Sequence, residues 1–253
     1  MKLRLLLLIS AFFVTFYTNA QHKITVAVAA NMQYAMEALK DAFNKQNKTD
    51  ISIVLGASGK LTQQIIAGAP FDVFISADTA FPAKVQAAGM AVAGPANYAQ
   101  GVLVLWSARG DMKPDIQLLT SDRVSHIAIA NPATAPYGAA AVYVMKKYQV
   151  YDKVAGKLVT GESITQASQF IASGNAEVGF TAKSIVIAEV MKGKGHWVEV
   201  KRGDYPAIKQ AAVLLKNNVG ARQFYEFLFS AEAKRIFERF GACVQAAKFV
   251  VRA

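Results

Sequence analysis

The sequence predicts an α/β fold arranged in two lobes. The first observation is that short apolar, β-branched runs alternate with segments of helical periodicity along the 253 residues. The runs that predict strands are Lys23–Ala29, Ile51–Leu55, Val73–Ser76, Val102–Trp106, Ile127–Ala130, Val178–Thr181, Trp197–Val200 and Ala211–Leu215. Such alternation is typical of mostly parallel sheets that are covered by helices on both faces.

Between these runs, apolar residues recur at intervals of three and four, which places them on one face of a helix. The clearest sets are Met32-Met36-Leu39-Phe43, Leu61-Ile65-Ile66, Phe224-Phe227-Leu228 and Ile236-Phe237-Phe240. Gly241 is the predicted end of the last helix.

Two turn-rich segments indicate where the chain crosses between the lobes. Gly94–Asn97 precedes the apolar run Gly101–Trp106, and Gly203–Pro206 precedes Ala211–Leu215. If the chain crosses at both points, its C-terminal segment returns to the first lobe. The predicted organisation is a first lobe of residues 21–100 plus 206–253 and a second lobe of residues 101–205.

Residues 1–20 have the pattern of a secretory signal peptide. Lys2 and Arg4 precede an apolar run that begins at Leu5, and Thr18-Asn19-Ala20 supplies small residues before a cut after Ala20. Polar residues interrupt the run before it reaches the ~20 apolar residues of a membrane-spanning helix. We therefore predict that the mature chain is exported to the periplasm.

The composition indicates an anion as the partner. The formal net charge is +11, and +9 remains once Lys2 and Arg4 leave with the signal peptide. This excess attracts anions. The basic residues are dispersed and no nucleic-acid motif accompanies them, so a nucleic acid is not expected. The single cysteine, Cys243, excludes an internal disulfide and is predicted to be a buried thiol.

Four predicted strands end in loops of small or polar residues that lead into helices. The loops are Ala29–Asn31, Gly56–Gly59, Asn131–Gly138 and Gly161–Ile164. The first N–H groups of a helix have no intrahelical partner and carry partial positive charge, so they bind anions. Ligands of open α/β sheets bind beyond the carboxyl ends of the strands, where these loops lie.

Simple helix capping is the alternative interpretation of these loops. Asn31 and Ser58 are both favoured capping residues. Ser163 with Gln166 fits a capping box, which would make Ile164 the first helical residue with a free N–H. From the loops alone, both interpretations stay open.

Other chemistry finds little support in the sequence. Gly56–Lys60 lacks the Ser or Thr that follows the lysine of a phosphate-binding loop. The three histidines are scattered, without the spacing of a zinc site. Asp72 and Asp78 flank one strand and are interpreted as turn caps rather than an acid/base pair. We therefore predict no catalytic residue, no cofactor and no direct metal ligand.

At the four loops the sequence resembles the periplasmic molybdate-binding proteins of ABC transporters, in their asparagine-containing branch. The resemblance covers essentially the whole mature chain. It is carried, in order, by Ala27–Met32, Gly56–Leu61, Gly68–Asp78, Ala128–Pro132, Ala135–Ala140 and Gly174–Phe180. It implies a type II periplasmic binding protein, with two lobes joined by two crossing strands and an oxyanion enclosed in the cleft between them.

The resemblance also implies the residues that hold the oxyanion. Asn31 occupies a ligand position that is serine or asparagine in different members, and Ser58 matches the binding serine of the second loop. Tyr137 lies where some members use only a backbone N–H, and Ile164 where a small apolar residue offers its N–H. Ala30 is a weaker candidate that can contribute only its backbone. Molybdenum would be bound only as the oxyanion through these groups.

Two positions depart from the family pattern. Ala182 stands where some members have a tyrosine at the cleft, and Tyr137 would replace that hydroxyl. Lys183 beside it would attract anions if it faced the cleft, although a solvated residue at a helix start is the alternative.

The resemblance implies that the protein, as a monomer, captures molybdate and tungstate and delivers them to the permease of an ABC transporter. Sites built only of neutral donors favour fully ionised oxygens and disfavour phosphate, which carries a proton near neutral pH. Three alternatives remain. They are another oxyanion such as sulfate, or a small organic acid, on the same fold; an exported enzyme, which would need a titratable group with a perturbed pKa in the cleft; and a regulatory sensor.

Overall fold

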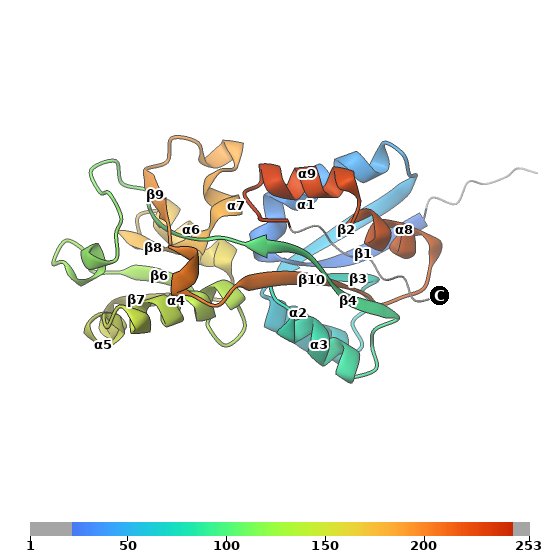
Figure 1. The fold of residues 1–253 in the computed structure, drawn as a ribbon, viewed down its shortest axis with the longest axis horizontal. Helices are drawn as coiled ribbons and strands as arrows, with labels where there is room; N and C mark the ends of the chain where they lie inside the picture. Colours follow the sequence, from blue (N-terminus) through green and yellow to red (C-terminus); the bar gives the residue numbers. More distant parts are fainter. Residues whose placement is uncertain (1–21, 245–253) are drawn as a thin grey trace, which may run out of the picture.

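The computed structural model describes residues 22–244, so the predicted signal peptide lies outside the described residues. Two five-stranded sheets form two lobes that lie side by side (Figure 1). The two-lobed α/β fold predicted from the alternation of strands and helices is therefore confirmed.

The sheet of the first lobe has the strand order β2-β1-β3-β10-β4. Its strands are β1 (His22–Ala29), β2 (Thr49–Gly56), β3 (Val73–Ser76), β4 (Ala93–Gly101) and β10 (Ile208–Leu214). Its helices are η1 (Ala30–Met32, 3-10), α1 (Gln33–Asn44), α2 (Ser58–Ile66), α3 (Ala80–Ala87), α8 (Val219–Phe227) and α9 (Ala231–Arg239). In Figure 1, α1 and α9 lie above this sheet and α2 and α3 lie below it.

The sheet of the second lobe has the strand order β7-β6-β8-β5-β9. Its strands are β5 (Leu103–Ser107), β6 (Ile127–Ala130), β7 (Leu158–Gly161), β8 (Val178–Ala182) and β9 (His196–Glu199). Its α-helices are α4 (Pro136–Lys147), α5 (Tyr151–Val154), α6 (Ile164–Ala172) and α7 (Lys183–Val186). Its 3-10 helices are η2 (Gln117–Thr120), η3 (Ala155–Lys157), η4 (Glu189–Met191) and η5 (Arg202–Asp204).

Both sheets are mixed rather than mostly parallel. β1 runs parallel to β2 and β3, and β6 runs parallel to β7 and β8. β10 runs antiparallel to β3 and β4, and β5 runs antiparallel to β8 and β9. The reason is that β5 and β10 each enter their sheet from the other lobe. They therefore start at the edge where the parallel strands end.

The side chains of β1 alternate between two apolar cores on opposite faces of the first sheet. Val26 and Val28 pack in a core with Phe43 of α1, whereas Ala27 packs in a core with Leu61 of α2. The apolar set predicted for the first helix is buried as expected: Met32, Met36, Leu39 and Phe43. The prediction of a buried thiol is wrong: Cys243 is only half-buried, and its backbone pairs with Gln100 of β4.

The chain passes between the lobes along two neighbouring segments, which Figure 1 shows side by side in green and brown. β4 ends at Gly101, and β5 begins only two residues later in the other sheet. The return passes through η5 into β10, where Ile208 pairs with Gly101. The lobe boundaries proposed from the sequence, at residues 100/101 and 205/206, stay a prediction.

Candidate functional site

The four loops expected to bind a ligand meet where the lobes face each other. Residues from all four, including Ala30, Ala57, Tyr137 and Ile164, belong to one buried apolar cluster. The two lobes touch directly at this place. The Ser184 hydroxyl donates to the carbonyl of Asn31 at 2.7 Å, and the Thr165 hydroxyl lies 3.3 Å from the carbonyl of Ala30. The structure therefore shows a closed cleft.

Asn31 is not a helix cap. It lies inside η1, and α1 has Met32 as its N-cap without a side-chain hydrogen bond. Its side chain is nevertheless buried, with 2% of the residue exposed, and its Oδ1 has no hydrogen-bond partner among the described residues. Buried polar atoms are normally paired. No helical N–H of the described residues donates to this oxygen, so the capping interpretation of Asn31 fails.

Ser58 is the first residue of α2, whose N-cap is Ala57, and the residue is 1% exposed. Its Oγ accepts a hydrogen bond from the backbone N–H of Ala77 at 3.0 Å. A hydroxyl has one proton to donate in addition to its lone pairs. Because the fold uses Oγ only as an acceptor, the proton of Ser58 is available to a ligand.

Tyr137 is the second residue of α4 and follows Pro136, so its backbone N–H lies in the first helical turn without an intrahelical partner. Its Oη accepts a hydrogen bond from Nε2 of Gln210 at 3.1 Å. Burial, together with the nearby Tyr205, raises the pKa of Tyr137 well above its ordinary value, against smaller lowering by hydrogen bonds with Gln210 and Asn31. The hydroxyl therefore keeps its proton.

Ile164 is the first residue of α6, and its backbone N–H is a free first-turn donor, as predicted. The N-cap Ser163 accepts from the N–H of Gln166 at 3.3 Å, which confirms the first half of the capping box. The second half is displaced by one residue, because the Gln166 side chain accepts from the N–H of Glu162 at 2.6 Å.

Comparisons with known proteins identify the family of this chain. Residues 24–242 match the family described as bacterial extracellular solute-binding protein. This chain belongs to that family. The molybdate-binding protein ModA of Rhodobacter capsulatus is 42% identical over 226 residues, which cover 88% of each chain. The ModA of Azotobacter vinelandii is 39% identical and covers 88% of this chain and 90% of its own length.

Solved structures of binding proteins have the same fold as this chain. The periplasmic molybdate-binding protein of Azotobacter vinelandii superposes with a TM-score of 0.83 at 34% identity, covering 88% of this chain and 99% of that one. The sulfate-binding protein SubI of Mycobacterium tuberculosis shares the fold, with a TM-score of 0.70 at 16% identity over 87% of this chain and 86% of SubI. The resemblance seen in the sequence is confirmed. As a solute-binding protein, the chain is a transport component and not an enzyme.

Two lysines of this solute-binding protein that follow the predicted site loops or lie beside them are in ion pairs. Lys60 of α2 and Glu162, before α6, form an ion pair of 2.7 Å that joins the lobes, with side chains 44% and 72% exposed. Lys183 begins α7, pairs with Glu199 and lies over the ring of Trp197. Lys183 is therefore neither a free cation in the cleft nor fully solvated.

The carboxylates of Asp72 and Asp78 accept hydrogen bonds from backbone N–H groups. Asp72 accepts from the N–H of Thr25 at 2.7 Å, and Asp78 accepts from the N–H of Phe81 at 3.1 Å. Burial raises the pKa of Asp78, although its hydrogen bonds lower it.

Residues 22–244 contain no group of three His, Cys, Asp or Glu that fits a metal ion. Within the same range, no helix has the length and apolar character needed to cross a membrane.

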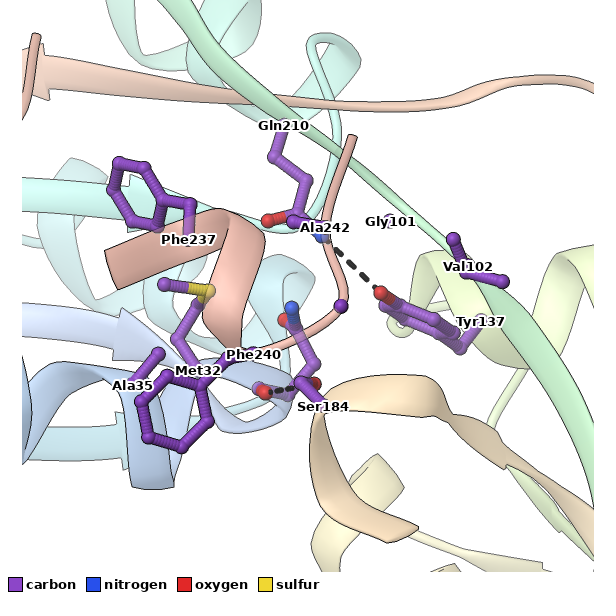
Figure 2. A pocket seen from close by; sticks show the side chains of 12 residues that line it. Met32, Ala35, Gly101, Val102, Tyr137, Ser184, Gln210, Phe237, Phe240 and Ala242 are labelled. Carbon is purple, nitrogen blue, oxygen red and sulfur yellow. Dashed lines mark hydrogen bonds between the residues drawn. The ribbon is translucent and has the colours of Figure 1, made fainter. Parts of the chain in front are cut away.

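A small pocket lies beside Asn31 and Tyr137. Figure 2 shows the hydroxyl of Tyr137 pointing to Gln210, next to Gly101 of the crossing strand. Gly101 is required here, because a Cβ would overlap Oη of Tyr137. Gln210, Gly101 and Ser184 are not predicted from the sequence. The only signal is Gln210 itself, a glutamine within the largely apolar strand β10.

Proposed function

We propose that this protein captures molybdate, and tungstate by the same contacts, and delivers the ion to the permease of an ABC transporter. The observation that carries the proposal is that the expected donors of both lobes, Asn31, Ser58, Tyr137 and Ile164, are buried where the two lobes are in contact. The choice of molybdate is supported by relatives of that name at 42% and 39% identity.

The proposed site holds the oxyanion by donors alone. Asn31 and Ser58 contribute their side chains from the first lobe, and Tyr137 and Ile164 contribute first-turn N–H groups from the second. Ala30 is a weaker, backbone-only neighbour. The helices that start at Ser58, Pro136 and Ile164 add the positive ends of their dipoles. A site without acceptors favours a fully ionised dianion over protonated phosphate.

Ligand binding and closure of the lobes are coupled in this proposal. A ligand that contacts both lobes stabilises the closed form by its greater affinity for it. The lobes are assigned to residues 21–100 plus 206–253 and 101–205. The signal peptide, residues 1–20, directs export to the periplasm and is then cleaved, and the mature protein presents the closed, monomeric form to the permease.

Calorimetric titration of residues 21–253 tests the proposal. Molybdate and tungstate are expected to bind much more tightly than sulfate, phosphate and a panel of small organic acids. Sulfate binding as tight as molybdate binding would overturn the ligand assignment and keep the oxyanion class. An absence of heat with every oxyanion would overturn the proposed function as a whole.

A further inference from the structure

Three buried side chains connect the crossing strands to Asn31. Oη of Tyr98, on β4, lies 2.9 Å from Oε1 of Gln210, on β10. Nε2 of Gln210 then lies 3.1 Å from Oη of Tyr137, on α4 of the other lobe. Tyr137 and Asn31 line the same pocket, and the Asn31 amide as placed turns its NH₂ group toward the Tyr137 hydroxyl, which lowers the pKa of Tyr137. All four residues are at most 4% exposed.

The donors and acceptors of these side chains determine the direction of each hydrogen bond in the series. The Tyr98 hydroxyl donates to the Gln210 carbonyl oxygen, although the carbonyl of Ser76 also lies within 3.1 Å. When the Tyr98 proton is donated to Gln210 rather than to Ser76, the NH₂ group of Gln210 faces Tyr137. Tyr137 then accepts from Gln210 and must donate its own proton elsewhere. The opposite amide orientation would make Tyr137 donate to Gln210 instead, and the variants below distinguish the two.

The unpaired Oδ1 of Asn31 supplies the missing acceptor. Oxygen and nitrogen of a side-chain amide have nearly the same shape, and the hydrogen-bond network decides which is which. Turning the Asn31 amide over gives the Tyr137 proton an acceptor in Oδ1 and leaves the NH₂ group, instead of Oδ1, without a partner in the protein. The NH₂ group of Asn31 is then left to face the oxyanion.

We propose that Tyr98, Gln210 and Tyr137 form a directed relay that holds the Asn31 amide with its NH₂ group toward the bound oxyanion. The Tyr137 side chain is thereby a positioning residue, while its backbone N–H remains a ligand donor. This inference rests on the proposed function. Since Asn31 and Tyr137 belong to different lobes, the relay is complete only when the cleft is closed.

The relay also makes a difference to selectivity. A fixed NH₂ group can only donate, so it rejects an oxyanion that presents an O–H at this position. Once released, the same amide can rotate and accept that proton. Loss of the relay should therefore reduce the preference for molybdate over hydrogen phosphate, which simple loosening of the fold would not do selectively.

A double-mutant cycle in the mature full-length protein tests the relay, with molybdate as the probe. Tyr137→Phe keeps the backbone N–H and is expected to weaken binding about 10-fold, the size of a hydrogen bond linked to a charged group. In an Asn31→Ala background, the same change should cost less than about 2-fold, because Tyr137 acts through Asn31. An equal loss in both backgrounds would overturn the proposal and make Tyr137 a direct ligand.

Gln210→Met and Tyr98→Phe test the direction of the chain. Both should weaken binding of molybdate in the Asn31 protein, reduce its preference over phosphate, and have little effect after Asn31→Ala. Tyr98→Phe carries this test if Gln210→Met does not fold, as judged by circular dichroism. Tightened binding in Gln210→Met would show that Tyr137 donates to Gln210 and would overturn the relay.

Tyr205→Phe is the matched control. Its hydroxyl accepts from the N–H of Leu103 at 3.1 Å in the same hinge region, outside the relay. It should leave the molybdate-to-phosphate ratio unchanged, and a shift as large as that of Tyr137→Phe would contradict the relay. If the unmutated protein itself binds no molybdate, the proposed function fails instead.

Discussion

The backbone N–H of Gly59 donates to the carbonyl of Thr134 at 2.9 Å, and this bond joins the two lobes by their main chains. Gly59 follows Ser58 in the first turn of α2, and Thr134 lies just before α4. The bond therefore draws together two of the helix N-termini that we assign to the oxyanion.

Gly59→Ala should weaken molybdate binding by opening this contact. The added Cβ would lie 2.8 Å from Cζ of Phe81 and 2.9 Å from Cα of Thr134. Relief of the second contact requires a shift of the Thr134 backbone, which is energetically unfavourable. Overpacking of this kind costs about 1–3 kcal/mol, which corresponds to roughly 5- to 150-fold in affinity. Calorimetry measures the change. Gly156→Ala, where no atom lies within 4 Å of the new Cβ, is the control and should bind normally.

Ser58→Ala should weaken molybdate binding by roughly 1.5–3 kcal/mol, the value of a hydrogen bond to a charged group. It also leaves the N–H of Ala77 without its acceptor, so a moderate loss of thermal stability is expected as well. The control is Thr62→Val on the same helix, because the buried hydroxyl of Thr62 has no partner among residues 22–244. An affinity that is the same in Ser58→Ala as in the unmutated protein would remove Ser58 from the site.

The ion pair of Lys60 and Glu162 should contribute little to closure, and only at low salt. Both side chains are largely exposed, and exposed pairs are worth about 0–1 kcal/mol. Lys60→Met and Glu162→Gln should each weaken molybdate binding less than about fivefold at low ionic strength, with no effect at high ionic strength. The double variant should be no weaker than either single one. If Glu162→Gln instead tightened binding, repulsion of the anion would outweigh the ion pair.

Stability should fall in alkaline solution because of buried tyrosines. Burial raises the pKa of Tyr225 to about 12 from an ordinary value of 10.0. The folded state holds this proton more tightly than the unfolded state. Its contribution is therefore complete below about pH 10 and is lost as the pH rises to about 12. Burial raises the pKa of Tyr98 and Tyr205 in the same direction.

Urea unfolding between pH 8 and pH 12 measures this loss. Tyr225→Phe should make the decline shallower, whereas Tyr143→Phe, at a position 49% exposed, should leave it unchanged. The same slope in all three proteins would show that Tyr225 does not contribute.

The sequence was sufficient for most of the fold, because its strands are apolar and bounded by turns. It failed at β4 and β7. β4 begins with Ala93-Gly94-Pro95 and has no β-branched residue, so its pairing with β10 depends on tertiary contacts that local pattern does not show. β7 has four residues and is half-exposed along much of its length, as an edge strand beside β6.

The site could be predicted only in part for a similar reason. The free N–H of Ile164 follows from local helix geometry, which the residues around it determine. The roles of Gln210 and Gly101 depend on the approach of Tyr137 from the other lobe, and no local pattern encodes a contact between residues so far apart in the chain.

The pairing of Gly101 with Ile208 has a consequence for the gene as well as for the protein. The chain leaves the first sheet and comes back to it at adjacent positions, so the whole second sheet is a single continuous insertion between two neighbouring points. Two fusion points are therefore enough to build a chimaera in which this lobe comes from a relative. Half of the proposed anion donors could be altered in one step, while the lobe that holds the other half stays unchanged.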